Sequence, residues 1–169
     1  KLYGVLEMAS LSYGYAITTY VGQNLGAKKY RRIRNGVRSG VYMALITSIV
    51  ISGVMVITGR NILSLFVSGE AGQVKQVLDI AYKYLFIMAI FLWVLYLLYV
   101  YRSAIQGLGN TLIPLASGVV EFCMRVGVAL LLPKLIGEDG IFYAEISAWS
   151  GAAILLIVSY VVIIRKYKE

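Results

Sequence analysis

Five long runs of apolar residues, separated by short polar segments, limit the folds open to this sequence. A helix needs about 20 mostly apolar residues to cross the hydrocarbon core of a bilayer, and each run reaches that length. Helices are expected because every backbone polar group inside lipid needs a hydrogen-bond partner within the span. The sequence therefore predicts an all-α fold, a polytopic transmembrane helical bundle, with spans at approximately 2–25, 36–58, 79–101, 111–132 and 141–164.

Composition supports a membrane protein and argues against most other classes. Hydrophobic residues make up 60% of the 169 residues and charged residues only 14%, whereas soluble domains average about 25% charged residues. The sequence has no His and a single Cys, Cys123, which excludes an internal disulfide and a multi-Cys metal site. It also has no phosphate-binding loop and no paired acids at catalytic spacing, so we expect neither an enzyme nor a metal or cofactor site.

The Lys and Arg residues are concentrated on one side of the predicted bundle. The loops 28–38 and 102–110 and the tail 165–169 carry ten of the sixteen, the opposite side carries five, and Arg125 lies within a span. Cytoplasmic loops carry an excess of Lys and Arg, so we expect a cytoplasmic C-terminus and location in the cytoplasmic (plasma) membrane. We attribute the net charge of +8 to orientation in the lipid bilayer and expect no nucleic-acid partner.

Two glycine pairs indicate close helix packing around the first basic loop. Gly22 and Gly26 are one helical turn apart at the end of the first span, and Gly36 and Gly40 repeat this spacing on the second. Small residues at this spacing allow two helix backbones to approach closely. The pattern predicts a tightly packed helical hairpin.

The end of the first span resembles a motif of the multidrug and toxic-compound extrusion (MATE) transporters. The run Gly22-Gln23-Asn24-Leu25-Gly26-Ala27, followed by a basic turn and a glycine-bearing helix, looks like the eighth and ninth helices of that family. The residues alone also allow a purely structural interpretation, in which the glycines pack and Gln23 and Asn24 cap the helix end at the membrane interface.

A second run, Gln106-Gly107-Leu108-Gly109-Asn110-Thr111, resembles the family's short turn between helices ten and eleven. Its glycines can end one helix, Asn110 or Thr111 can cap the next, and Pro114 falls in the first turn. The spans then match helices eight to twelve, so the resemblance implies most of the second of two six-helix lobes. We expect the N-terminal lobe, and the first helix of the second lobe, to belong to the same longer chain.

The resemblance implies ion-coupled antiport by alternating access, in which Na⁺ or H⁺ enters while a drug-like, often cationic, compound leaves. One branch of the family has an acidic residue near the middle of the tenth helix, but residues 91–100 contain none. Coupling would then depend on acids in the N-terminal lobe or on Glu7.

Two other functions are compatible with the sequence. A lipid-linked oligosaccharide flippase of the same superfamily should have more basic residues inside the spans, where they would hold phosphates. A non-transporting membrane scaffold subunit should have neither an aqueous cavity nor a polar face on the first and third spans.

Charged residues inside a membrane are costly and therefore candidates for function. Glu7 is predicted either to face a central cavity as the coupling residue or to lie at the interface near a helix end. Glu121 and Arg125 are four residues apart near the middle of the fourth span, so we expect an intramembrane ion pair, or part of a polar relay. Asp79 and Lys83 have the same spacing and suggest a second pair.

The 14 tyrosines form a further group of candidates. Tyr13 and Tyr20 share one face of the first span, and Tyr96 and Tyr99 share one face of the third. Tyrosine rings can line a cavity for lipophilic cations, because they offer apolar surface, a hydroxyl and cation–π attraction. Tyrosines also form belts at membrane interfaces. Tyr13 and Tyr96, the deepest in their spans, are the candidate cavity residues.

Overall fold

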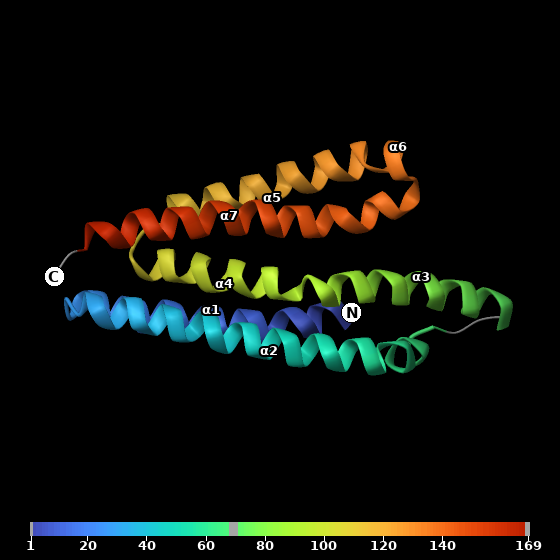
Figure 1. Ribbon diagram of the computed structural model, residues 1–169, viewed down its shortest axis with the longest axis horizontal. Helices are drawn as coiled ribbons and strands as arrows, with labels where there is room; N and C mark the ends of the chain where they lie inside the picture. The colour runs from blue at the N-terminus through green and yellow to red at the C-terminus, as the bar shows by residue number, and fades with distance from the viewer. Residues whose placement is uncertain (1, 68–70, 168–169) are drawn as a thin grey trace.

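The computed structural model describes residues 2–67 and 71–167. Figure 1 shows α5 and α7 along one side of an elongated bundle, α1 and α2 along the other, and α4, continued by α3, between the two pairs. The all-α bundle is confirmed, and the described ranges contain no strand. The elements are α1 (Leu2–Gly26), α2 (Tyr30–Ser64), α3 (Ala71–Ile90), α4 (Leu92–Gly107), α5 (Leu112–Leu131), α6 (Pro133–Ile136), the 3-10 helix η1 (Glu138–Ile141) and α7 (Phe142–Lys166).

Three helical segments of the described chain are long and apolar enough to cross a membrane, namely Tyr30–Ser64, Leu112–Ile136 and Asp139–Lys166. A fourth candidate is α3 together with α4, which are bent by 50° at a short break. The first expected span, α1, does not pass the same test. It carries Glu7 together with several Ser, Thr, Gln and Asn residues, which lower its mean hydropathy.

The third expected span, 79–101, is not one continuous helix. It is divided at Phe91, which separates α3 from α4. Proline and Gly-containing segments are the usual causes of sharp kinks, but residues 84–100 contain neither residue type. The break therefore could not be predicted from the sequence.

The core of the bundle is centred on α4. Nine of its residues are buried, and α4 contacts α1, α2 and α7. In contrast, α5 buries only Pro114 and Ser117 and exposes Leu115, Val119 and Phe122. Exposed apolar side chains are favourable where the neighbour is lipid. The largest fully buried side chains include Tyr96, Leu92 and Leu98 of α4, Ile33 of α2 and Trp149 and Leu156 of α7.

The hairpin of α1 and α2 is closely packed, but by only one of the two predicted glycine pairs. A Cβ atom at Gly36 would overlap the ring of Tyr20, and a Cβ atom at Gly40 would overlap Ile17. Gly22 instead faces α4, where its Cβ would lie 3.8 Å from the Gly107 carbonyl oxygen, and Gly26 has nothing within 4 Å. The expectation that Gly22 and Gly26 pack the hairpin is wrong, because their face of α1 turns away from α2.

The turn after α1 closes with two backbone hydrogen bonds of the kind that commonly ends a helix. The Lys28 amide donates to the Leu25 carbonyl at 3.0 Å, and the Lys29 amide donates to the Asn24 carbonyl at 2.9 Å. This geometry requires a left-handed residue, which is Lys28 with φ of 54°. Non-glycine residues are strained in that conformation.

The turn between α4 and α5 has the same arrangement, with Gly109 in the left-handed position at φ of 82°. Asn110 then accepts a hydrogen bond from the Ile113 amide through its side-chain oxygen at 3.1 Å. Of the two residues expected to cap α5, Asn110 therefore makes the capping bond.

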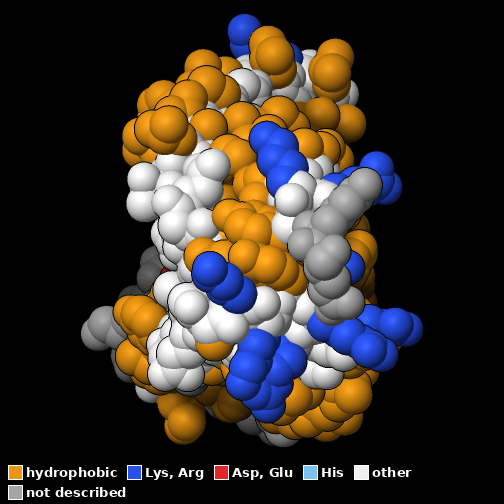
Figure 2. All heavy atoms as spheres, turned by 90° about the vertical axis from the view of Figure 1, so that its left-hand side faces the viewer, with side chains coloured by type: hydrophobic (Ala, Val, Ile, Leu, Met, Phe, Trp, Pro, Cys, Tyr) orange, Lys and Arg blue, Asp and Glu red, His pale blue; other side chains and the backbone are white. Residues whose placement is uncertain are grey.

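Basic side chains gather at one end of the bundle. The turns at 27–29 and 108–111 and the C-terminal end of α7 lie together at that end (Figure 1). Figure 2, which views it directly, shows several Lys and Arg side chains among apolar and other residues. At the opposite end the expected Asp79–Lys83 pair is wrong. Asp79 pairs with Arg60 of α2, and Lys83 pairs with Asp139, each at 2.6 Å, because each side chain reaches a neighbouring segment.

We expect Gly107→Ala to destabilise the contact between α1 and α4. Its Cβ would lie 2.7 Å from the Val21 Cβ and 2.9 Å from the Thr18 carbonyl oxygen, and overpacking of this kind costs about 1–3 kcal/mol. The free energy of unfolding in detergent micelles is the measurement. Gly53→Ala is the control, because nothing lies within 4 Å of that position, and equal losses for both variants would contradict the prediction.

We expect Lys28→Gly to raise the free energy of unfolding by about 0.5–1 kcal/mol, because glycine adopts the left-handed conformation without strain. Lys29→Gly is the matched control. It removes the same charge from the same turn, but Lys29 has an ordinary negative φ of −94°. The idea fails if the two variants change the unfolding free energy in the same direction and by the same amount.

Candidate functional site

A polar stripe runs along one face of the otherwise apolar helix α4. Tyr99, Arg102, Ser103 and Gln106 follow the spacing of three and four residues that places side chains on one helix face. The stripe borders two adjoining hollows, one of about 200 Å³ against α1 and one of about 360 Å³ against the start of α5. We call these two hollows the α4 groove, and Arg102 and Gln106 line both.

The wall of the α4 groove on α1 is held close to α4. A Cβ atom at Gly14 would lie 2.9 Å from the Ser103 hydroxyl oxygen, and the Thr18 hydroxyl donates to the Ser103 carbonyl at 3.2 Å. A larger residue at position 14 would separate the helices. On the α1 side the hollow is thus lined by Gly14 and Thr18, together with the larger Leu11 and Tyr15.

Glu7 lies beside the α4 groove. Its carboxylate accepts a hydrogen bond of 2.7 Å from the Tyr99 hydroxyl, which joins α1 to the polar stripe. Four other acids, Asp79, Glu121, Asp139 and Glu145, each pair with a Lys or Arg, whereas no salt bridge within the described ranges involves Glu7. Glu7 is therefore an acid on α1 that forms no salt bridge with a described basic residue.

Arg102 pairs with Glu121, which links α4 to α5. The side chains are only 21% and 18% exposed, so the pair is largely removed from its surroundings. Arg102 also donates to the Ser117 hydroxyl at 3.0 Å, and the buried Ser117 hydroxyl donates to the Pro114 carbonyl at 2.7 Å. This network fixes the guanidinium group at the junction of the two hollows.

The expected Glu121–Arg125 pair is wrong. Arg125 instead makes two hydrogen bonds of 2.8 Å to the two carboxylate oxygens of Glu145 on α7. The prediction from a spacing of four residues took account only of α5, the helix that carries both residues. In the bundle, α4 and α7 both contact α5, and each charge finds a partner on a neighbouring helix.

Tyr13 and Tyr96 meet, with ring centroids 5.9 Å apart, but they occupy different environments. Tyr13 lines a largely apolar hollow of about 450 Å³ between α1 and α2, and its hydroxyl lies 2.6 Å from that of Thr47. Tyr96 is fully buried. The expectation that Tyr96 lines a cavity is wrong, because its ring fills the core between α1 and α4.

Gln23 and Asn24 lie at the end of α1 and not in a cavity. Asn24 is buried, and its side-chain amide donates to the Tyr20 carbonyl at 2.8 Å. Its own carbonyl accepts the Lys29 amide in the turn. Gln23 is exposed. In the structure, Asn24 thus supports the helix end and the basic turn that follows.

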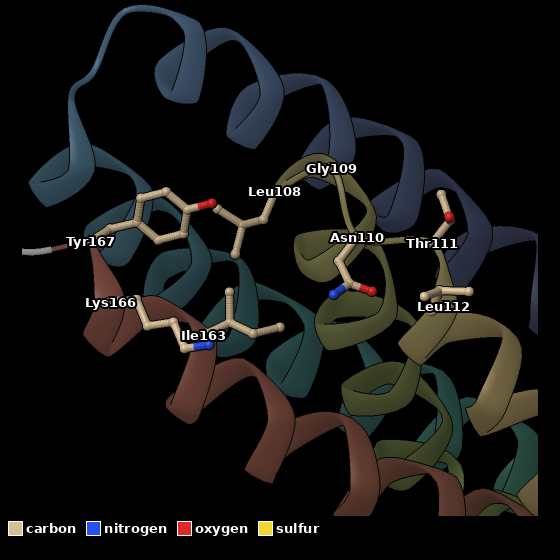
Figure 3. A pocket seen from close by; sticks show the side chains of 8 residues that line it. All are labelled: Leu108, Gly109, Asn110, Thr111, Leu112, Ile163, Lys166 and Tyr167. Atoms are coloured by element: carbon tan, nitrogen blue, oxygen red, sulfur yellow. The ribbon is translucent and has the colours of Figure 1, made fainter.

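Another hollow, of about 450 Å³, lies at the basic end of the bundle (Figure 3). The turn between α4 and α5 forms one side with Asn110 and Thr111, and the end of α7 forms the other with Ile163, Lys166 and Tyr167. Its lining combines polar residues of the turn with Leu112 and Ile163 at the ends of α5 and α7.

A family model described as MatE matches residues 1–131, from the first residue to the end of α5. The chain belongs to the MatE family. The resemblance inferred from the two motifs is thereby confirmed, and both motifs fall within the matched region. The residues of the α4 groove, together with Glu7 and Glu121, also lie within it. No curated protein matches the chain at a significant level.

Membership in the MatE family makes this chain a membrane transporter of the MATE type. The α4 groove was not among the sequence-based candidates, since Arg102 was counted only as a loop cation. The spacing of Tyr99, Arg102, Ser103 and Gln106 on a helix rich in Leu and Val was the signal that could have identified the polar face. Nothing in the sequence indicated which acid each Arg would contact.

We expect double-mutant cycles to recover the ion pairs seen in the structure. Arg102→Gln should lower the free energy of unfolding by about 3 kcal/mol, because Glu121 would remain as an uncompensated charge. Arg102→Gln combined with Glu121→Gln should cost about 1–3 kcal/mol less than the sum of the single changes. Unfolding in mixed micelles provides the measurement.

The cycle between Glu121 and Arg125 serves as the control. Glu121 and Arg125 are one turn apart on α5 but form no ion pair in the structure, so their coupling should not exceed about 0.5 kcal/mol, the value of an ordinary pair four residues apart on a helix. A stronger coupling for Glu121 with Arg125 than for Glu121 with Arg102 would support the sequence-based pairing over the structure.

Proposed function

We propose that this transporter is an ion-coupled antiporter that exports drug-like, often cationic, small molecules across the cytoplasmic membrane. The coupling ion is Na⁺ or H⁺, and the transport cycle is alternating access. The C-terminus lies in the cytoplasm, consistent with the basic end of the bundle. Glu7 is the coupling residue that this chain contributes.

The observation that carries the proposal is the uncompensated charge of Glu7. A carboxylate inside a membrane must be neutralised by a partner, a proton or a cation, and no Lys or Arg in the described ranges pairs with Glu7. Its carboxylate is oriented by Tyr99 beside a polar groove. Exchange of a proton or Na⁺ at this carboxylate then changes the local charge by one unit.

Binding of a coupling ion can shift a transporter between states only if the ion binds one state more tightly than the other. Glu7 and Tyr99 are on different helices, α1 and α4, so any relative movement of these helices changes the ligands around the carboxylate. This arrangement supplies the differential binding that coupling requires.

The hollow between α1 and α2 supports a lipophilic substrate. Its volume of about 450 Å³ falls in the range of small-molecule sites, roughly 300–1,000 Å³. Tyr13 and Tyr20 contribute rings to a lining that is mainly apolar, and tyrosine rings attract organic cations.

The two alternatives are less well supported. A flippase for lipid-linked oligosaccharides needs unpaired basic residues within the spans, but Arg102 and Arg125 are each neutralised by a glutamate. A non-transporting scaffold has no need for the polar face of α4 or for the hollows beside it.

The test is ion-driven efflux of a fluorescent lipophilic cation from vesicles that contain the full-length protein. We expect efflux with a Na⁺ or a proton gradient and its loss in Glu7→Gln. Tyr99→Phe removes one hydrogen bond to the ionised carboxylate, worth about 1.5–3 kcal/mol. Because that bond favours the charged form, its loss should lower the proton concentration for half-maximal proton-driven efflux by roughly tenfold or more.

Asp79→Asn is the control, because it removes an exposed acid at the far end of the bundle. It should leave ion dependence unchanged. Unaltered coupling in Glu7→Gln would exclude Glu7 as the coupling residue, and the absence of efflux under both gradients would remove the antiporter proposal itself.

A further inference from the structure

We propose that the protein binds an anionic phospholipid in a groove between α2 and α7, with the phosphate on Arg34 and Arg38 and an acyl chain along the apolar floor. The groove has a volume of about 250 Å³. Its floor includes Val41 of α2 and Tyr160 and Ile164 of α7. The two guanidinium groups at the mouth of the groove suit the phosphate of a phospholipid, and the apolar floor suits its acyl chain.

The groove is at the level of the membrane interface. Arg34 and Ile164 lie near the basic end, where α2 begins and α7 ends, whereas Tyr42 is eight residues further along α2, about 12 Å deeper. Tyr101 and Tyr160 meet edge to face at 5.4 Å in the floor, and tyrosines favour the interface. The mouth is thus at headgroup depth and the floor at the start of the acyl region.

The two arginines are held in place by contacts to uncharged groups, and neither forms a salt bridge with a described acid. Arg34 donates to the Tyr167 carbonyl at 2.6 Å, and Arg38 donates to the Tyr42 hydroxyl at 3.3 Å. The ion pairs found in the described ranges all involve other basic residues. Guanidinium groups bind phosphate oxygens through paired N–H donors.

The surroundings of the groove are positive as well. Lys166 lines the neighbouring hollow on the same end of α7 (Figure 3), and further Lys and Arg side chains cover this end of the bundle (Figure 2). Clusters of basic residues at the cytoplasmic end of membrane helices attract anionic lipids. Glu169 follows in the sequence but lies outside the described residues.

Other ligands suit the groove less well. Free phosphate would leave the apolar floor unused, and a lipophilic cation would be repelled by two arginines. A zwitterionic lipid would place its own positive group near the same two charges. The combination of phosphate, net negative charge and acyl chain therefore identifies the ligand class as an anionic phospholipid.

The experiment is titration of the purified full-length protein in detergent with phosphatidylglycerol or phosphatidylcholine of identical chains, followed by native mass spectrometry. We expect tighter binding of phosphatidylglycerol. Each basic residue near an anionic lipid contributes about a fivefold gain, so Arg34→Gln with Arg38→Gln should weaken phosphatidylglycerol binding roughly thirtyfold.

The matched control is Arg31→Gln with Arg32→Gln. These exposed residues lie on the same first turns of α2 but do not line the groove, so the same loss of charge should weaken binding by less than about fivefold. An equal loss in both double variants would show only diffuse attraction to the basic end and would overturn the proposal.

A second variant tests the apolar floor without changing charge. Val41→Trp fills the groove and should abolish the preference for phosphatidylglycerol, and glycerol phosphate, which lacks acyl chains, should not compete. Unchanged lipid binding in Val41→Trp, or competition by glycerol phosphate, would refute the acyl-chain site. If the double Arg variant does not fold in a thermal unfolding control, Arg38→Gln alone and Val41→Trp decide the question.

Discussion

A charge within the membrane needs a compensating partner, and this constraint organises the bundle. Arg102 and Glu121 join the central helix α4 to α5, and Arg125 and Glu145 join α5 to α7. Each pair satisfies two charges that would be costly alone, and each also fixes which helix faces meet. Glu7 is an acid for which the described residues provide no salt bridge, and its proposed role in ion coupling rests on this observation.

The sequence predicted what depends on local spacing and missed what depends on neighbouring helices. The long apolar runs predicted the helices, and the spacing of Gly36 and Gly40 predicted close packing. Both predictions depend only on residues near one another in the sequence. The partners of Glu121 and Arg125 lie on other helices, so no spacing within α5 could reveal them. The break at Phe91 was equally invisible, since neither Pro nor Gly marks it.

The proposed coupling-ion site at Glu7 and the proposed lipid groove differ in the sign of their charge. Beside the α4 groove, Glu7 forms no salt bridge with a described residue, and at the basic end neither Arg34 nor Arg38 forms one. We propose the first as a site for a coupling cation and the second as a site for an anionic lipid headgroup. The opposite charges of the two sites also limit competition between ligands. A cation is repelled by the arginines of the lipid groove, and an anionic lipid is repelled by Glu7.

The groove along α4 exists because α5 packs mainly on α7 and only lightly on α4. Within α5, burial is limited to Pro114 and Ser117. Little apolar surface of α5 is therefore available to pack against the polar stripe. Closing the gap would place Leu115 against Arg102 and Gln106, and apolar side chains cannot satisfy their hydrogen-bonding groups. The Arg102–Glu121 pair instead holds α5 beside α4 through polar contacts. The polar face of α4 and the apolar Pro114 and Leu115 of α5 thus line opposite sides of the hollow between the two helices.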